Sequence, residues 1–170
     1  MKRCAARGLP GCIDPLTCPH WEWRGCPKAL AGQYMSRKSL RAIVLETMCD
    51  NNLYIHYLFT GAPRFQNDLK ALGPSPLVKD IMNGIRPSKD LPYTVNGRTR
   101  MILYYITDKA YKKHPVFHSC YVKQVTRKQR IFNRLREAVR KDMERLYGVL
   151  TTRFHTLLRP SRFTTVSQND

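Results

Sequence analysis

The sequence predicts a single α/β domain that is rich in strands at first and has a long helix at the C-terminus. Three observations predict this fold class. Runs of apolar and β-branched residues at 42–45, 53–59 and 101–106 are typical of buried strands. Apolar residues recur every three or four positions from 131 to 150, and a double step leads to 157, which indicates an amphipathic helix. The 170 residues leave room for one ordinary domain.

Local signals place most of the strands and one short helix. Residues 39–48 predict a buried strand, and Asp50-Asn51-Asn52 predicts a turn. Residues 53–59 then form the second strand of an antiparallel hairpin. The chain is loop-like from 61 to 92, with a short helix around 76–83. Residues 101–106 predict a third strand, and 111–126 a basic connection.

The long C-terminal helix is the best-defined element. Pro160 is expected to end it, because proline lacks the backbone N–H that a helix requires. The polar tail at 164–170 is expected to be disordered. The apolar face of the helix is marked by Ile131, Leu135, Val139, Met143, Leu146, Leu150 and Leu157. Basic residues on its other sides are Arg134, Arg136, Arg140, Lys141 and Arg145.

Charge indicates the class of partner. The chain carries 30 Lys and Arg against 12 Asp and Glu, a net charge of +18. Such a surface attracts a polyanion, since each phosphate that is neutralised releases condensed counterions. No secretory signal and no apolar run long enough for a membrane span occurs, and no small-molecule substrate is expected. The expected nucleic-acid contacts are Lys123, Arg127, Lys128, Arg130, Arg134, Arg136, Arg140 and Lys141.

The six cysteines are expected to be reduced thiols. Cys12, Cys18, His20 and Cys26 supply enough ligands for a zinc ion. Their spacing lacks the paired Cys-x2–4-Cys knuckles of common structural sites, so zinc is not expected. His56 is expected to be a hydrogen-bonded core histidine. Trp21 and Trp23 are expected to be packing anchors.

Three blocks of sequence carry a resemblance to a known family. The first comprises residues 7–11, His20-Trp21-Glu22-Trp23, Cys26-Pro27 and Gly32-Gln33-Tyr34. The second is 61–77, with Asn67-Asp68 and Ser75-Pro76-Leu77. The third joins 93–97 and Tyr104-Tyr105 to 137–145, 148–150 and Arg153-Phe154. Residues 7–163 thereby resemble the catalytic region of Harbinger-type transposases and transposase-derived nucleases, in the plant branch.

The resemblance implies a fold and a chemistry. The family has a ribonuclease-H-like fold, a mixed sheet of about five strands flanked by helices. Three carboxylates (Asp, Asp, Glu) hold two divalent metals, Mg²⁺ or Mn²⁺, which suit phosphodiester attack on DNA. Members act in the nucleus with a Myb-like partner. Relatives have a helical region upstream of the first block, so the resemblance implies an incomplete fold: 1–163 is a truncated, degenerate domain of this type.

Two of the three family carboxylates carry over directly. The second Asp corresponds to Asp68 and the Glu to Glu144. Taken alone, Asp68 fits a helix cap or turn, and Glu144 fits a solvated pair with Arg140. Aligned on Cys18, His20 and Trp21, the position of the first catalytic Asp holds Thr17, whose hydroxyl is uncharged.

Asp14 is the alternative source of the first carboxylate. Three residues is an odd step, so on a regular strand Asp14 faces away from the side of Thr17. Pro15 removes a donor from what would be a central strand. Asp14 reaches the site only if a bulge interrupts the strand.

Three functional hypotheses follow. The first is a transposase-derived, nuclease-like protein that binds nucleic acid through its basic surface and is catalytically impaired. The second is an active divalent-metal-dependent DNA nuclease that uses Asp14, Asp68 and Glu144. The third is a small basic RNA-binding protein. The replacement by Thr17 leaves enzymatic activity as an open question at this point.

Overall fold

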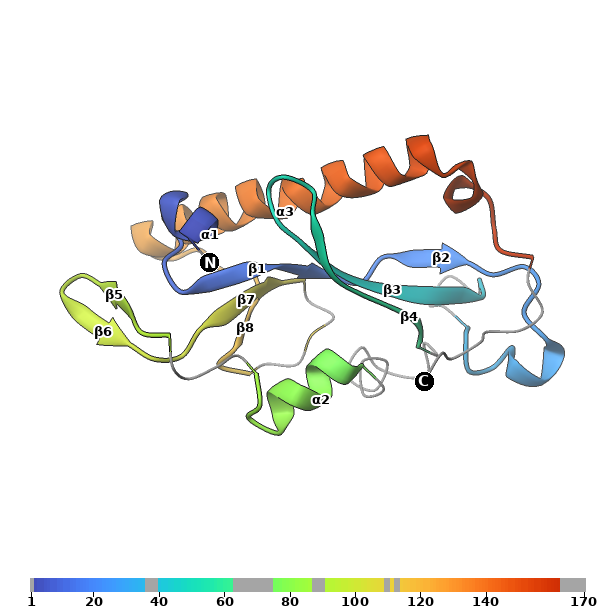
Figure 1. Cartoon of the computed structure of the whole chain (residues 1–170), viewed down its shortest axis with the longest axis horizontal. Coiled ribbons are helices and arrows are strands. Elements are labelled where there is room, and N and C mark those ends of the chain that lie inside the picture. The colour runs from blue at the N-terminus through green and yellow to red at the C-terminus, as the bar shows by residue number, and fades with distance from the viewer. Residues whose placement is uncertain are drawn as a thin grey trace.

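A mixed β-sheet with helices on both faces forms the body of the protein (Figure 1). The structure is a computed structural model and describes residues 2–35, 40–62, 75–86, 91–108, 111 and 114–162. The sheet has the order β2-β3-β1-β7-β8, with β4 on the other edge of β3. Its strands are β1 (Cys12–Thr17), β2 (His20–Glu22), β3 (Ala42–Cys49), β4 (Ile55–Ala62), β7 (Tyr104–Thr107) and β8 (Phe117–His118).

The direction of pairing changes at β1. Strand β3 pairs antiparallel with β1, β2 and β4, whereas β7 runs parallel to β1 and β8 runs parallel to β7. Because β7 is parallel to β1, the carboxyl ends of both strands lie at the same edge. A separate hairpin of β5 (Tyr93–Val95) and β6 (Arg98–Arg100) projects from one end of the molecule (Figure 1).

The helices cover opposite faces of the sheet. Helix α3 (Arg127–Arg153) crosses one face together with the short α1 (Lys2–Ala6), and α2 (Pro76–Met82) covers the other (Figure 1). Thr126 begins α3 with a capping box that includes Gln129. The 3₁₀ turns η1 (Lys28–Leu30) and η2 (His155–Leu158) complete the described elements.

Strand β1 is irregular at its proline. The register of β1 against β7 shifts between Cys12 and Pro15, because the proline ring carries no N–H for the ladder. Ile13 and Leu16 consequently pack on the same face, beside Leu77 of α2, although three residues separate them. The interruption postulated for the Asp14 alternative is therefore present.

The apolar core is divided by the sheet. On the α2 side, Leu16, Val44 and Leu77 belong to one cluster. On the α3 side, Val139 packs with Cys12 and Ile106, and Met143 and Leu146 pack with Cys49. Burial of these side chains holds α3 in a fixed rotation on the sheet.

Several sequence predictions are confirmed and others need correction. The β3–β4 hairpin and α2 are confirmed. The third strand begins only at Tyr104, and Met101 and Ile102 are exposed. The basic connection at 111–126 contains strand β8. Helix α3 ends at Arg153 rather than at Pro160, so Leu157 lies outside it, and Ile131 is exposed.

The predicted disordered tail, 164–170, lies outside the described residues. In the described part of the chain, none of the helices has the length and apolar character that a membrane span requires.

Candidate functional site

Two polar side chains meet where β1 and β7 end. Leu16 pairs with Thr107 across the parallel strands, so the next residues, Thr17 and Asp108, lie beside each other. The Thr17 hydroxyl donates a long hydrogen bond to Asp108, with 3.4 Å between Oγ1 and Oδ2. Crevices at the carboxyl ends of strands in α/β sheets are common ligand sites. This pair defines the candidate site.

Helix α3 brackets this pair with two contacts to the sheet. On one side, Nη2 of Arg136 donates to the carbonyl oxygen of Thr107 at 2.6 Å. On the other side, the Tyr147 hydroxyl donates to Oγ1 of Thr47 at 2.6 Å, and Thr47 is the antiparallel partner of Thr17. The helix therefore passes over the ends of β1 and β7 between residues 136 and 147.

Arg140 and Glu144 lie on the same stripe of α3 as these two contacts. The steps from 136 through 140 and 144 to 147 are four, four and three residues, which keep side chains on one side of a helix. Glu144 is exposed, and its Oε1 lies 2.8 Å from Nη2 of Arg140. Arg140 also contacts Glu137, with 3.2 Å between Nε and Oε2. The solvated ion pair expected for Glu144 is thus present at the border of the site.

Asp14 belongs to a second polar cluster, beside α1. Its Oδ2 lies 4.0 Å from Nε2 of His56, which is 3.6 Å from Oδ2 of Asp50. Arg3 of α1 pairs with Asp50. Burial raises the pKa of Asp14 above its ordinary value, against the lowering effect of the N-terminus, His56 and Arg3. Asp14 therefore lies next to the bulge in β1, and its side chain is close to His56.

Asp68 lies outside the described residues, as does the whole of 63–74. The described chain resumes at Ser75, which is fully buried and caps α2. The Ser75 hydroxyl accepts a hydrogen bond from the backbone N–H of Val78 and donates one to Glu46.

Asp108 is the site residue that the sequence analysis missed. It directly follows the apolar run of β7, and carboxylates placed after strands are common in α/β sites. The signal needed was the parallel pairing of β7 with β1, which joins segments about 90 positions apart in the chain. No local pattern contains that pairing.

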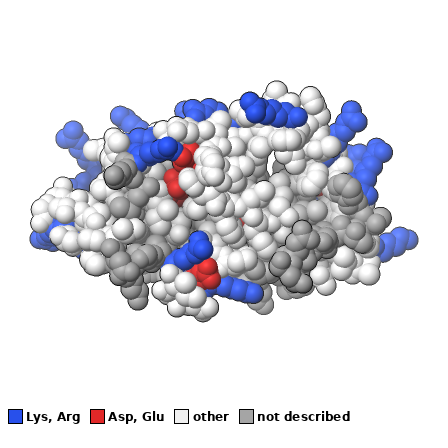
Figure 2. Space-filling model, viewed as in Figure 1, with Lys and Arg blue, Asp and Glu red and all other residues white. Residues whose placement is uncertain are grey.

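The exposed side of α3 carries a row of basic side chains. With 100° of rotation per residue, Arg127, Arg130, Arg134 and Lys141 fall within about 60° of one another, opposite the core residues Val139 and Met143. We call these four residues the basic stripe. All four are exposed, and in the described part of the chain none of them forms an ion pair. Figure 2 shows blue side chains along the edge that α3 occupies in Figure 1.

The other predicted nucleic-acid contacts differ in exposure. Lys123 and Lys128 are exposed close to the basic stripe. Arg140 is half-buried in its ion pairs. Arg136 requires correction, because the sequence analysis placed it on an exposed side of the helix. Only 3 % of Arg136 is exposed, and its guanidinium contacts Thr107 and Glu137.

The cysteines of the hypothetical zinc cluster lie apart in the core. Cys12, Cys18 and Cys26 belong to three different apolar clusters. The Cys18 thiol shares a hydrogen bond with the Tyr111 hydroxyl, at 2.9 Å. Burial raises the pKa of the Cys18 thiol above its ordinary value, which favours the thiol form over the metal-binding thiolate. Among the described residues, no three His, Cys, Asp or Glu side chains are grouped as metal ligands would be.

The aromatic anchors differ from each other. Trp23 is fully buried and packs edge-on against Tyr34, with ring centroids 4.8 Å apart, which confirms its packing role. Trp21 is half-buried, and its indole N–H donates to the Arg159 carbonyl at 2.8 Å. His56 is more exposed than a core histidine, with 39 % of its side chain accessible.

Comparison with known proteins identifies the family. The chain matches the family described as plant transposon protein over residues 1–169. Comparisons with curated proteins and with solved structures give no match. The match includes both strands that meet at Thr17 and Asp108 and all of α3. The chain therefore belongs to the plant transposon protein family.

Proposed function

We propose that this chain is a transposase-derived protein of ribonuclease-H-like fold that binds duplex DNA through α3 and is impaired in metal-dependent cleavage. The basic stripe is the observation that carries the proposal. Its residues span 14 positions from Arg127 to Lys141, about 21 Å of helix at 1.5 Å per residue. Exposed cations in a row of this length can neutralise several phosphates of a DNA duplex.

The sheet supports the finer assignment of the fold. Strands β4, β3, β1, β7 and β8, together with the short β2, form a six-stranded mixed sheet, with helices on both faces and a long helix at the C-terminus. This arrangement agrees with the mixed sheet of about five strands that the Harbinger resemblance implies. A nuclear location and a Myb-like partner are further parts of this proposal.

The donor groups at the site support impaired cleavage. A pair of divalent metals needs several hard, negatively charged oxygen ligands that converge. At the ends of β1 and β7 the described residues offer the Asp108 carboxylate, the neutral Thr17 hydroxyl and a Glu144 carboxylate paired with Arg140. This set of donors does not fit a two-metal centre, and no cleavage step is derived from it.

One observation keeps the active nuclease as a second candidate. The interruption of β1 between Cys12 and Pro15 is the irregularity by which Asp14 would join Asp68 and Glu144. Cleavage of plasmid DNA with Mg²⁺ or Mn²⁺ that disappears in both Asp14→Asn and Asp68→Asn would establish this candidate and contradict impaired cleavage.

Binding by α3 is tested with two variants of equal charge. The stripe variant is Arg130→Gln, Arg134→Gln, Lys141→Gln. The control variant is Lys79→Gln, Arg98→Gln, Arg100→Gln, whose three side chains are exposed on α2 and β6. In fluorescence anisotropy with a labelled 20-base-pair duplex, we expect the stripe variant to lose about tenfold or more in affinity at moderate salt. The control variant should lose less than about threefold.

Two outcomes contradict the proposal. Equal losses in both variants would mean that net charge, and not α3, determines binding. A strong preference for RNA of the same sequence over the DNA duplex would favour the RNA-binding hypothesis instead.

A further inference from the structure

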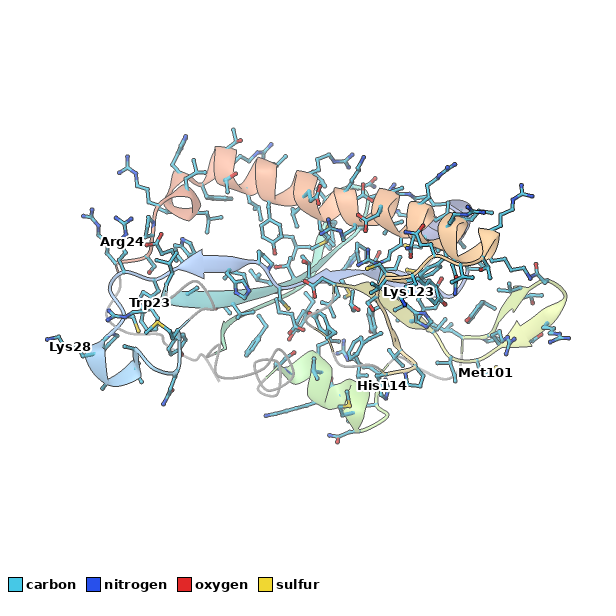
Figure 3. The ribbon with its side chains drawn as sticks, turned by 180° about the vertical axis from the view of Figure 1, so that it is seen from behind. Trp23, Arg24, Lys28, Met101, His114 and Lys123 are labelled. Carbon is cyan, nitrogen blue, oxygen red and sulfur yellow. The ribbon has the colours of Figure 1, made fainter. Side chains whose placement is uncertain are left out.

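A cavity of about 610 Å³ lies at the end of the molecule where α3 stops and the chain returns to β2. Its lining includes Trp21, Arg24, Arg159, Ser161 and Arg162. Arg24 lies at this end of the molecule, below the turn that follows α3 (Figure 3). The volume is in the range of sites that bind small ligands or single nucleotides.

Backbone hydrogen bonds build the walls of this cavity. The Ser161 N–H donates to the Glu22 carbonyl at 2.7 Å, and the Gly25 N–H donates to the Ser161 carbonyl at 3.0 Å. The Trp21 indole adds its bond to the Arg159 carbonyl. Residues 159–161 are therefore held alongside β2, so the cavity is formed before any ligand arrives.

The charge of the cavity selects an anion. Arg24, Arg159 and Arg162 contribute three guanidinium groups from two separate segments of chain. Among the described residues, the Glu22 carboxylate lies 2.9 Å from Nε of Arg24 and offsets one of the three charges. Guanidinium groups bind phosphate oxygens in a bidentate manner, so three of them around one cavity favour a phosphate ligand.

An unpartnered hydroxyl also lines the cavity. Ser161 is only 4 % exposed, and its Oγ has no hydrogen-bond partner among the described residues. Buried hydroxyl groups are normally satisfied, because leaving one without a partner costs free energy. Rotation about χ1 would let this hydroxyl donate to a phosphate oxygen held by the arginines.

Trp21 gives the cavity a stacking surface. Its ring is half-buried, in contrast to the fully buried Trp23, and lines the cavity beside the arginines. Bases stack on aromatic rings with little sequence preference, and arginine planes add to such stacking.

We propose that this cavity binds one unpaired nucleotide of a DNA strand, with its phosphate on Arg159 and Arg162 and its base on Trp21. The site is separate from the basic stripe, because it lies beyond the end of α3. It adds recognition of an unpaired strand, such as a DNA end or junction, to the proposed binding of duplex DNA.

Tryptophan fluorescence reports on this site directly. The chain has two tryptophans, and Trp23 is fully buried, so quenching by a bound base reports on Trp21. The probe is a ten-nucleotide oligothymidylate, compared with the same strand annealed to its complement and with inorganic phosphate. We expect saturable quenching by the single strand, and at least a fivefold weaker effect of the duplex.

Matched variants separate the cavity from the basic stripe. In Arg159→Gln, Arg162→Gln, the quenching should require at least tenfold more oligothymidylate, because both side chains are exposed and their loss leaves the core intact. Arg98→Gln, Arg100→Gln removes the same charge from β6 and should leave the titration within twofold of the original. Trp21→Phe should abolish the quenching.

Three outcomes would overturn the inference. In the first, quenching is unchanged in Arg159→Gln, Arg162→Gln. In the second, the duplex quenches as strongly as the single strand. In the third, inorganic phosphate displaces the oligonucleotide at equal concentration. Duplex binding that still depends on the basic stripe while quenching is absent would overturn the cavity site and leave the proposed function intact. Loss of both would contradict both proposals.

Discussion

The Thr17 hydroxyl donates a hydrogen bond to the Asp108 carboxylate, across the ends of two parallel strands that are far apart in the sequence. A threonine here keeps the edge polar but adds no negative charge. The contact between the two side chains is a hydrogen bond from a neutral donor, and not an ion pair.

The first prediction is that Thr17→Asp creates affinity for a divalent cation. The new carboxylate would lie next to Asp108, and two adjacent carboxylates repel each other unless a cation is shared. We expect Mn²⁺ to raise the melting temperature of this variant by several degrees more than that of the original chain, because a ligand that binds only the folded state stabilises it.

Thr17→Asn is the control for this prediction, since it has the size of the aspartate without its charge. The two variants are compared by thermal unfolding with increasing Mn²⁺, and binding is measured by calorimetry. An equal response of the two variants to Mn²⁺ would show that position 17 does not face a shared cation site.

The elements that the sequence predicts correctly depend on local signals. The β3–β4 hairpin follows from two apolar runs around Asp50-Asn51-Asn52, and α2 follows from Ser75 and Pro76 at its start. Asp108 could not be found in this way, because its partner Thr17 is brought to it by the pairing of β1 with β7. The register shift in β1 is different, because Pro15 is a local signal for an interrupted strand.

The rotation of α3 was predicted only in part. Val139, Met143 and Leu146 are buried as expected. The buried face turns away from Ile131 and takes in Arg136, because the Thr107 carbonyl at the end of β7 accepts a hydrogen bond from that guanidinium. A pattern of apolar residues cannot reveal a buried arginine that donates a hydrogen bond to a backbone carbonyl of another element.

The second prediction concerns Arg136, whose guanidinium is buried. Arg136→Met keeps an unbranched aliphatic stem but leaves the Thr107 carbonyl without its donor. An unsatisfied buried acceptor costs about 1–3 kcal/mol, so we expect a loss of about 2 kcal/mol in the free energy of unfolding. Arg134→Met, on the exposed side of α3, should change it by less than about 0.5 kcal/mol.

Urea unfolding of both variants, followed by circular dichroism, checks this difference. Both variants remove an arginine from the same helix, so a difference in their free energies of unfolding reports on where each arginine lies. Similar losses in the two variants would contradict the buried position of Arg136.

The third prediction follows from Glu46, which is fully buried beneath α2. Its carboxylate accepts hydrogen bonds from the hydroxyls of Ser75, Tyr57 and Tyr111. Burial raises the pKa of Glu46, and these hydroxyl donors only partly oppose that effect. The folded state therefore holds a proton on Glu46 at pH values where the unfolded chain has released it.

This difference gives a definite sign to the pH dependence of stability. Between the ordinary pKa of glutamate and the raised pKa of Glu46, the folded state binds more protons than the unfolded state. The contribution of Glu46 to the free energy of unfolding is therefore present below the ordinary pKa and is lost as the pH rises through the raised one. In Glu46→Gln this fall should be absent.

The measurement is the free energy of unfolding of both proteins in urea at intervals from pH 4 to pH 8. As the pH rises, we expect the free energy of unfolding of the original chain to fall relative to that of Glu46→Gln. A difference that is constant across this range would mean that Glu46 has the same pKa in both states.

The fourth prediction is the salt dependence of duplex binding. If the four cations of the basic stripe each neutralise one phosphate, the logarithm of the association constant should fall with the logarithm of salt concentration with a slope of about −3.6. The stripe variant, which keeps only Arg127, should show a slope of about −1. The control variant with substitutions on α2 and β6 should keep the slope of the original chain.

Anisotropy titrations from 50 to 300 mM NaCl measure these slopes. If α3 makes the contacts, the slope depends on which three cations are removed. An equal reduction of the slope in both variants would therefore mean that the phosphates contact basic residues over the whole surface.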